Sequence, residues 1–136
     1  MKLTRSLRHS GGMNTAMAKV LIVDDSPTET YKLTGILERN GHSVIVAENG
    51  EAGLSKAKLE LPDVVLMDIV MPGLNGFQAT RQLSKAKETA AIPVIIVSTK
   101  DQETDRVWGL RQGARAYLTK PVQEKELIGL IAEVTA

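Results

Sequence analysis

The sequence predicts an α/β fold built on a parallel sheet with helices on both faces. From residue 18 onward, β-branched apolar runs alternate about five times with segments of helical periodicity, and this alternation is typical of βαβ units. Two runs, Val64–Met67 and Pro93–Val97, are continuously apolar, as expected of strands that are covered on both faces. A chain of 136 residues has room for one such domain with a single core.

Five strands are expected, each followed by a turn or a helix. Their bounds are Lys19–Val23, Ser43–Ala47, Asp63–Met67, Pro93–Val97 and Ala116–Leu118. The first helix should begin at Ser26, because Ser26 and Glu29 form a capping-box pattern with Pro27 at the first helical position. Asn40 and Gly41 should end this helix.

Four further helices complete the alternation. The second should run from Gly50 to Leu59 and end before Pro62, with Leu54 and Ala57 pointing toward the core. The other three are placed by turn signals and by apolar residues at helical spacing: one with Phe77, Thr80 and Leu83 after a loop containing Pro72-Gly73 and Asn75-Gly76, one over Gln102–Gln112 ended by Gly113, and one with Leu127, Ile128, Ile131 and Val134. Because this last helix reaches the end of the sequence, no output domain is expected.

The composition excludes several classes of protein. The chain has no cysteine, which rules out disulfides, thiolate zinc sites, iron–sulfur clusters and cysteine nucleophiles, and which is compatible with a reducing compartment. No apolar run approaches the ~20 residues needed to span a bilayer. The basic residues near the start have no apolar stretch behind them, so they do not form a secretory signal. We therefore expect a cytoplasmic protein without membrane insertion.

The charge is unevenly distributed along the chain. The formal net charge is +1, but residues 1–17 contain Lys2, Arg5 and Arg8 and no acidic residue. Of the 17 basic residues, 14 then remain against 16 acidic ones, which indicates no concentrated basic face and no nucleic-acid partner. We expect residues 1–17 to be a disordered extension and residues 18–136 to form the domain.

Acidic residues follow two of the expected strands. Asp24 and Asp25 come directly after the first strand, and Asp68 follows the third. If the two strands are neighbours in a parallel sheet, three carboxylates meet at one edge, where their charges repel. A hard cation such as Mg²⁺, which prefers oxygen ligands, would relieve that repulsion. The three residues are therefore a candidate metal site, although Asp24 and Asp25 would also suit the start of a helix.

The later strand ends supply groups that suit phosphoryl transfer. Ser98 and Thr99 follow the fourth strand, and Lys120 follows the fifth. In open α/β sheets, ligands bind beyond the carboxyl ends of the strands. There a carboxylate can be the nucleophile, and a hydroxyl and an ammonium group can stabilise phosphoryl oxygens. The plainer alternatives are a cap for the next helix at Ser98 and Thr99 and a solvated Lys120.

These residues, taken in order, resemble a response-regulator receiver domain of the flavodoxin-like (βα)5 type. The segments that carry the resemblance are Asp24-Asp25, Asp68 with Met71-Pro72-Gly73, Ser98-Thr99 and Lys120-Pro121. It covers about everything after Met17. Residues 24–29, 67–82 and 99–105 are further similar to the single-domain PilH-type regulators of type IV pilus twitching motility.

The resemblance implies a role for each site residue. Asp68 would accept a phosphoryl group from a chemotaxis-type histidine kinase, and Mg²⁺ would be bound by Asp25 directly, by Asp24 mainly through water, by Asp68 and by the backbone carbonyl of Val70. Ser98 would hydrogen-bond a phosphoryl oxygen. Lys120 would pair with Asp68 or with the phosphate, and a cis Lys120–Pro121 peptide is implied.

The resemblance also implies a switch and an output surface. Phosphorylation would draw Ser98 inward and shift the surface of the fourth helix, fifth strand and fifth helix, which would contact a motility protein. Tyr117 is either a switch residue or a half-buried filler of the sheet, and Trp108 is either core or part of a partner site. His9 and His42 have no nearby motif partners and are expected at the surface of a monomer.

Two positions depart from the commonest receiver pattern. Val70 and Lys100 lie two residues after Asp68 and Ser98, and we hypothesise that they tune the lifetime of the aspartyl phosphate.

Four alternatives compete with the switch function. One is a phosphate sink that drains a shared kinase. An aspartyl-nucleophile phosphatase would be expected to carry an acid where Val70 stands. A flavin-binding module is disfavoured because Asp24 and Asp25 would repel its phosphate, and an unphosphorylated scaffold would gain nothing from the acidic cluster.

Overall fold

A five-stranded parallel sheet forms the centre of the computed structural model, which describes residues 17–136. The strands are β1 (Lys19–Val23), β2 (Ser43–Ala47), β3 (Val64–Met67), β4 (Val94–Ser98) and β5 (Ala116–Thr119). The helices are α2 (Pro27–Arg39), α3 (Gly50–Glu60), α4 (Gly76–Lys85), α5 (Glu103–Arg111) and α6 (Glu124–Thr135). The predicted fold class is confirmed. Apart from Met17, the predicted extension over residues 1–17 lies outside the described residues, as does His9.

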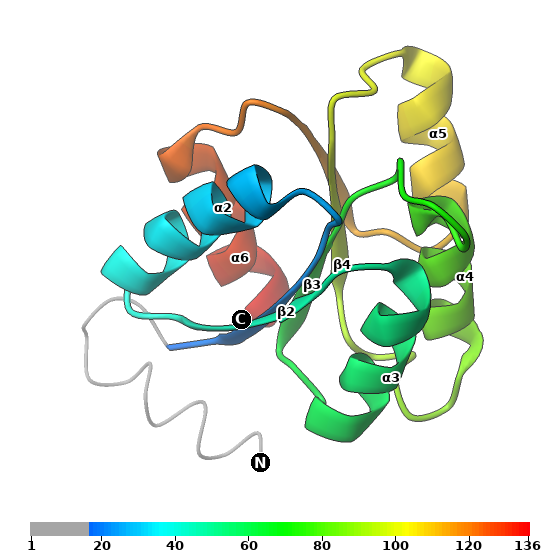
Figure 1. Cartoon of the computed structure of the whole chain (residues 1–136), viewed down its shortest axis with the longest axis horizontal. Helices are drawn as coiled ribbons and strands as arrows, with labels where there is room; N and C mark the ends of the chain where they lie inside the picture. Colours follow the sequence, from blue (N-terminus) through cyan, green and yellow to red (C-terminus); the bar gives the residue numbers. More distant parts are fainter. Residues whose placement is uncertain (1–16) are drawn as a thin grey trace.

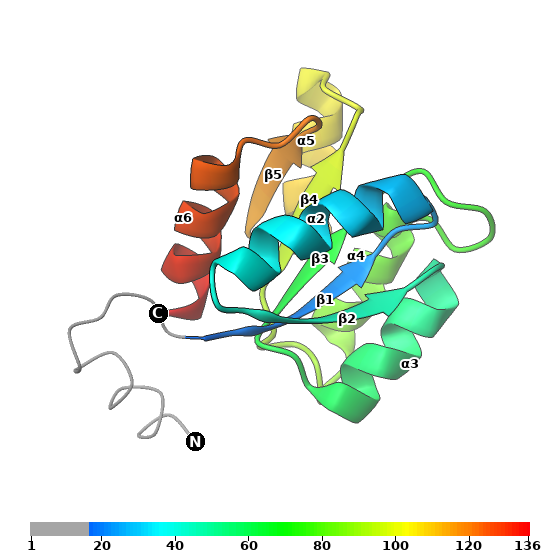
Figure 2. The same cartoon turned by 60° about the vertical axis from the view of Figure 1, so that its left-hand side comes forward.

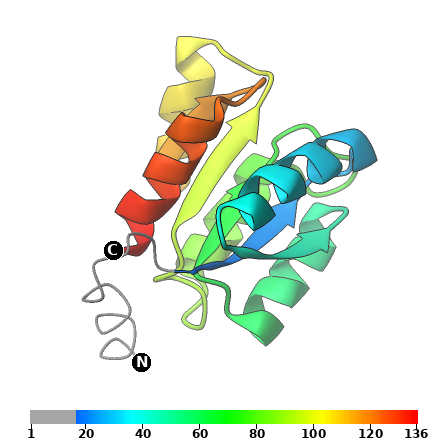
Figure 3. The same cartoon turned by 90° about the vertical axis from the view of Figure 1, so that its left-hand side faces the viewer.

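The sheet separates two layers of helices. Helices α2 and α6 lie over one face, and α3, α4 and α5 lie over the other (Figure 1). Figure 3 looks onto the face covered by α2, in blue and cyan, and by α6, in red. The strand order is β2-β1-β3-β4-β5, and all strands run in the same direction (Figure 2). Because the order reverses between β1 and β3, the carboxyl ends of these two strands form the topological switch point.

Alternating residues of each central strand build two cores. Along β1, Val20 and Ile22 belong to the cluster beneath α2 and α6, whereas Leu21 and Val23 belong to the cluster beneath α3 and α4. This division follows from the two-residue period of a strand. Each fully buried aliphatic side chain, such as that of Leu127, contributes roughly 1.5–3 kcal/mol to the stability of the fold.

The helix starts are fixed by local hydrogen bonds. The Ser26 hydroxyl accepts from the backbone N–H of Glu29 at 3.3 Å, with Pro27 at the start of α2, as predicted. At α4, Asn75 and Gln78 form a reciprocal capping box at 2.9 and 3.0 Å. Because α2 follows β1 and α4 follows β3, these caps also shape the loops around the switch point.

His42 is the site of a wrong prediction. It was expected at the surface, but its residue is only 7% exposed, and its Nδ1 accepts a hydrogen bond from the backbone N–H of Ala18 at 3.0 Å. The reason is that His42 directly precedes β2, whose first residues pair with the start of β1. A side chain there covers the end of the neighbouring strand.

Helix α3 agrees with its predicted orientation. Ala57 is buried, and Leu54 is partly buried against the same core cluster. No helix among residues 17–136 is long and apolar enough to cross a membrane.

Candidate functional site

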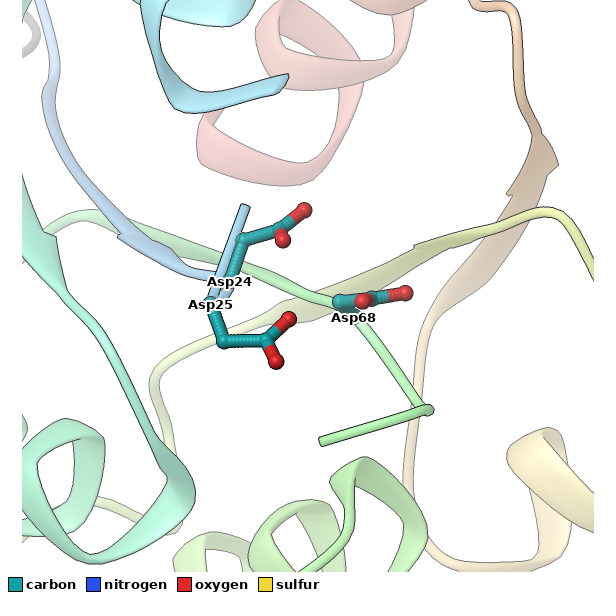
Figure 4. A group of neighbouring side chains, drawn as sticks. All are labelled: Asp24, Asp25 and Asp68. Carbon is teal, nitrogen blue, oxygen red and sulfur yellow. The ribbon is translucent and has the colours of Figure 1, made fainter. Parts of the chain in front are cut away.

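Three carboxylates meet at the switch point between β1 and β3. Val23 and Met67 are register partners at the ends of these strands, so Asp24 and Asp68 leave the sheet side by side. The Asp68 backbone N–H donates to the Val23 carbonyl at 2.9 Å. Carboxylate oxygens of Asp24, Asp25 and Asp68 all lie within 4.8 Å of one another, and Figure 4 shows these side chains projecting together from the strand ends. The predicted juxtaposition is therefore present.

Burial makes this cluster electrostatically unfavourable without a cation or a proton. Asp24 and Asp68 are buried, while Asp25 is exposed. The pKa of Asp68 rises from an ordinary 3.8 to about 6, chiefly because burial penalises the charged form. The charges of Asp24 and Asp25 raise this pKa further, and Lys120 lowers it. The protein therefore compensates the charge of Asp68 only in part.

Lys120 lies among the carboxylates. Its Nζ is 2.8 Å from Asp24 Oδ2, 3.7 Å from Asp68 Oδ1 and 4.0 Å from Glu29 Oε1. Burial alone would lower the pKa of Lys120, but the hydrogen bond to Asp24 and the charge of Asp68 outweigh it, and the pKa is raised. The ammonium group is therefore charged, with Asp24 as its nearest partner. It lies within reach of Asp68, as the resemblance implied.

The backbone around Lys120 connects it to Ser98. The Lys120 backbone N–H donates to the Ser98 carbonyl at 2.8 Å, and the Lys120–Pro121 peptide is cis. Ser98 is fully buried at the end of β4, and its Oγ accepts a hydrogen bond from the Lys100 backbone N–H at 3.2 Å. Both predicted phosphate-contacting residues thus lie at the same edge of the sheet as Asp68.

The loop that follows Asp68 is held close to helix α4. The Gly76 backbone N–H donates to the Ile69 carbonyl at 3.0 Å, and a side-chain carbon at Gly76 would overlap the Asp68 carbonyl. Only glycine fits there. Farther along the loop, the Leu74 backbone N–H donates to Glu51 Oε2 at 3.3 Å. The side chain of Val70 is turned outward, with the residue 59% exposed.

Glu29 is a site neighbour that the sequence reasoning assigned only to helix capping. It lies in the first turn of α2 and its carboxylate faces Lys120 at 4.0 Å. The position of Glu29 in the sequence indicates this placement, because a helix that follows a strand end has its first turn at the same edge of the sheet. Glu29 is therefore a third carboxylate within 4.0 Å of the Lys120 ammonium group, after Asp24 and Asp68.

Tyr117 and Trp108 have different environments. Tyr117 is 9% exposed, and its hydroxyl donates to the Lys100 carbonyl at 2.6 Å, so the residue connects β5 to the loop after Ser98. Trp108 is 49% exposed on α5, next to the exposed Val107 and near the exposed Leu110. The core interpretation of Trp108 is wrong, because the buried face of this short helix is occupied by Gly109 rather than by Trp108.

The donor set fits a hard divalent cation. Asp24, Asp25 and Asp68 offer only oxygen ligands, the kind that Mg²⁺ prefers. The raised pKa of Asp68 reflects an electrostatic cost of its charge, and a bound cation would offset that cost. With a carboxylate nucleophile, a buried hydroxyl and an ammonium group at one sheet edge, the site has the parts needed for phosphoryl transfer to a carboxylate.

The fold and this site together define a receiver domain of response regulators. The family described as the response regulator receiver domain matches residues 20–132, and the chain belongs to this family. It is thus the signal-receiving, phosphate-accepting module of a two-component system.

Within the family, the chain matches the PilH-type single-domain regulators. It is 71% identical over 120 residues to protein PilH of Pseudomonas aeruginosa, covering 88% of this chain and 99% of that protein. Chemotaxis protein CheY4 of Vibrio cholerae superimposes with a TM-score of 0.81 at 29% identity, covering 88% and 99% of the two chains. The receiver domain of the histidine kinase PA1611 of P. aeruginosa has a TM-score of 0.81 at 27% identity, covers 88% and 98%, and has magnesium coordinated in its active-site cleft.

Proposed function

We propose that this chain is a phosphorylation-controlled regulator of a chemotaxis-like two-component system that controls type IV pilus twitching motility. Asp68 accepts the phosphoryl group from a chemotaxis-type histidine kinase. The observation that carries the proposal is the buried Asp68 with its raised pKa, set between two further carboxylates and the Lys120 ammonium group. The 71% identity to PilH and the resemblance to twitching-motility regulators support the motility assignment.

Mg²⁺ would be held by Asp25 directly, by Asp24 mainly through water, by Asp68 and by the Val70 carbonyl. When bound, it would neutralise charge on the phosphoryl oxygens. In the transfer, an Asp68 carboxylate oxygen forms a bond to phosphorus as the bond to the kinase histidine nitrogen breaks. Lys120, already within 3.7 Å of Asp68, stabilises the negative charge of the product.

The output of the switch would be a change in protein binding. The Ser98 hydroxyl donates a hydrogen bond to a phosphoryl oxygen. Tyr117 responds through the loop at Lys100, because its hydroxyl donates a hydrogen bond to the Lys100 carbonyl. The surface formed by α5, β5 and α6 then contacts a downstream motility protein. Exposed Trp108 supports this surface, since tryptophan is enriched among residues that carry binding energy.

Two alternatives predict different behaviour. A phosphate sink would lose its phosphoryl group quickly and would need no output partner. An aspartyl-nucleophile phosphatase would turn over phosphate esters, but the exposed apolar side chain at Val70 offers no acid for that reaction. The proposed tuning of the phosphate lifetime by Val70 and Lys100 is tested by the dephosphorylation rates of Val70→Asn and Lys100→Glu. Rates equal to that of wild type in both variants would contradict it.

The decisive experiment uses a small phosphodonor. The protein is incubated with Mg²⁺ and acetyl phosphate, and its intact mass is measured. A mass gain of one phosphoryl group is expected, and it should be absent in Asp68→Asn and without Mg²⁺. Asp101→Asn, at an exposed acid outside the cluster, serves as the matched control and should be phosphorylated normally. No mass gain with any donor would overturn the proposal.

The remaining assignments follow from this function. We propose a monomeric, cytoplasmic protein whose receiver domain spans residues 18–136, preceded by an extension over residues 1–17, with no nucleic-acid partner and no membrane insertion. Sedimentation with and without Mg²⁺ and acetyl phosphate tests the oligomeric state.

A further inference from the structure

Arg106, to which the sequence reasoning assigned no role, joins helix α5 to strand β5. Its side chain is half-buried, and its Nη2 donates a hydrogen bond to Thr119 Oγ1 at 2.8 Å. Its Nη1 lies 3.5 Å from the backbone carbonyl oxygen of Tyr117. The guanidinium carbon is 5.1 Å from the centroid of the Tyr117 ring, which is within the range of cation–π attraction. One side chain thus contacts both the ring and the backbone of β5.

Tyr117 is held from its other end by the loop after β4. Its hydroxyl donates to the Lys100 carbonyl at 2.6 Å, and the backbone N–H of the same Lys100 donates to Ser98 Oγ at 3.2 Å. The residue Lys100 therefore stands between Ser98 and the tyrosine hydroxyl. If Ser98 forms a new hydrogen bond and the loop moves, the Lys100 carbonyl that accepts from Tyr117 moves with it.

Helix α5 packs against strand β5 (Figure 2). A side-chain carbon at Gly109 would come within 2.7 Å of Ile96 Cδ1 and 3.3 Å of Tyr117 Cδ2. The absence of a side chain at Gly109 permits this close approach. Arg106, three residues earlier on the same helix, then places its guanidinium group over the ring.

We infer that Arg106 is a positioning residue that holds Tyr117 in its buried position and thereby couples the loop after Ser98 to helix α5. The coupling part of this inference rests on the proposed function. Val107 and Trp108, which follow Arg106 directly, are both exposed. Through Arg106, a movement of Tyr117 reaches the helix that carries these two exposed apolar side chains.

A simpler role for Arg106 would be to attach α5 to β5 without regard to the tyrosine. Such an attachment depends on the hydrogen bond to Thr119, and replacing Thr119 by Val removes that acceptor while leaving the guanidinium group over the ring. Replacing Arg106 by Met keeps most of the aliphatic stem but removes the charge and the donors. The two substitutions therefore separate attachment from positioning of the ring.

The test uses fluorine NMR of protein labelled with 3-fluorotyrosine. The chain contains two tyrosines, and Tyr31 is 82% exposed on α2, so it serves as an internal reference that Tyr31→Phe assigns. In Arg106→Met, the Tyr117 resonance should move toward that of Tyr31, because the ring becomes accessible to water. A Tyr117 resonance that stays in place in the folded variant would overturn the inference.

Matched variants complete this arm. Arg111→Met removes an exposed basic residue of the same helix and should leave both resonances unchanged. Arg106→Lys keeps a cation near the ring without the fork geometry and should restore the resonance in part. Thr119→Val should move it less than Arg106→Met, and the opposite order would mean that attachment alone positions the ring. Circular dichroism establishes that each variant is folded.

A second arm measures coupling to the phosphorylation site. Beryllofluoride, an acyl-phosphate mimic, is titrated in the presence of Mg²⁺ while the fluorescence of Trp108, the only tryptophan of the chain, is recorded. We expect Arg106→Met to change the apparent Kd at least about fivefold, the lower end of typical coupling between sites, and Arg111→Met to leave it unchanged. Equal affinities of wild type and Arg106→Met would overturn the coupling.

The failure of this inference is distinguishable from failure of the proposed function. If the wild-type protein bound no beryllofluoride and accepted no phosphoryl group, the proposed function would fall, and the coupling would fall with it. The fluorine comparison in Mg²⁺-free protein would still decide whether Arg106 positions Tyr117.

Discussion

At the scale of single residues, Asp68 shows how its surroundings prepare a carboxylate for a cation. It lies at the end of an apolar strand, where the sheet and the neighbouring acids disfavour its charge, and Lys120 compensates only in part. A bound divalent cation would offset the repulsion between Asp68 and its acidic neighbours. The same environment has a measurable cost in stability.

We predict that Asp68→Asn stabilises the metal-free protein at neutral pH. The folded-state pKa of about 6 exceeds the ordinary 3.8, so above pH 6 the ionised group destabilises the fold, by less than the roughly 3 kcal/mol of the full shift because solvent screens the partly buried charge. As the pH falls through 6 toward 3.8, the folded protein takes up a proton first and the penalty disappears. Urea unfolding in EDTA should show a gain for the variant at pH 7.5 that vanishes near pH 4. A gain independent of pH would contradict this account.

His42 gives a second pH dependence of opposite sign. Burial lowers its pKa below the ordinary 6.5, and its Nδ1 must be unprotonated to accept from Ala18. Its stabilising contribution is therefore complete above pH 6.5 and is lost as the pH falls below that value. His42→Asn retains an acceptor oxygen but does not titrate, so the variant should lose less stability than wild type between pH 7.5 and 5.5. Parallel losses in urea unfolding would refute this assignment.

At the scale of secondary-structure elements, the helices that start beside the switch point shape the site. Helix α4 begins at Gly76, which packs directly on the backbone of Asp68 and Ile69. Helix α3 reaches the same loop through Glu51, whose carboxylate accepts from Leu74. Helix α4 therefore holds the start of the loop that carries Val70, and helix α3 holds the part of it near Leu74.

Two glycines in helices should respond to alanine in opposite ways. At Gly76 the new carbon would overlap the Asp68 carbonyl, whereas at Gly129 in α6 nothing lies within 4 Å. Gly76→Ala should therefore lower the unfolding free energy by about 1–3 kcal/mol. Gly129→Ala should raise it by roughly 0.5–1 kcal/mol, because alanine is the better helix former. Thermal and urea unfolding of the pair measure both effects, and equal shifts of one sign would refute the packing argument.

At the scale of the whole molecule, the strand order brings together groups that are far apart in the chain. With β1 and β3 adjacent and β4 and β5 following on one side, the residues at four strand ends share one edge. Lys120 and Asp24 are separated by 96 positions and still lie 2.8 Å apart. A ligand that binds at this edge therefore contacts residues from several strands and stabilises the whole domain.

We predict that Mg²⁺ raises the stability of the whole domain. A ligand that binds only the folded state at ten times its Kd adds about 1.4 kcal/mol to the unfolding free energy. The melting temperature of wild type should therefore rise with Mg²⁺ concentration, whereas Asp25→Asn should need a higher concentration for the same rise. Asp101→Asn provides the matched control. An equal response of all three proteins would indicate nonspecific ion effects only.

Much of the fold and the acidic cluster could be predicted from the sequence because they depend on local patterns. Apolar runs, capping residues and turn signals define the five strands to within one residue at each end. Acids placed directly after two such runs must leave the sheet at its carboxyl edge. For this reason Asp24, Asp25 and Asp68 could be expected at one edge of the sheet, and their contact depends in addition on β1 and β3 being neighbours.

The contacts between distant segments were decided only by tertiary structure. The burial of His42 over Ala18, the position of Glu29 beside Lys120 and the cover of Tyr117 by Arg106 all depend on how the helices pack on the sheet. No local pattern contains that information, because such contacts arise when a helix and a strand from different parts of the chain fill the same space. Local sequence patterns therefore specify the elements and the residues of the acidic cluster, whereas the strand order and the packing of the helices bring these residues together and give each charge its partners.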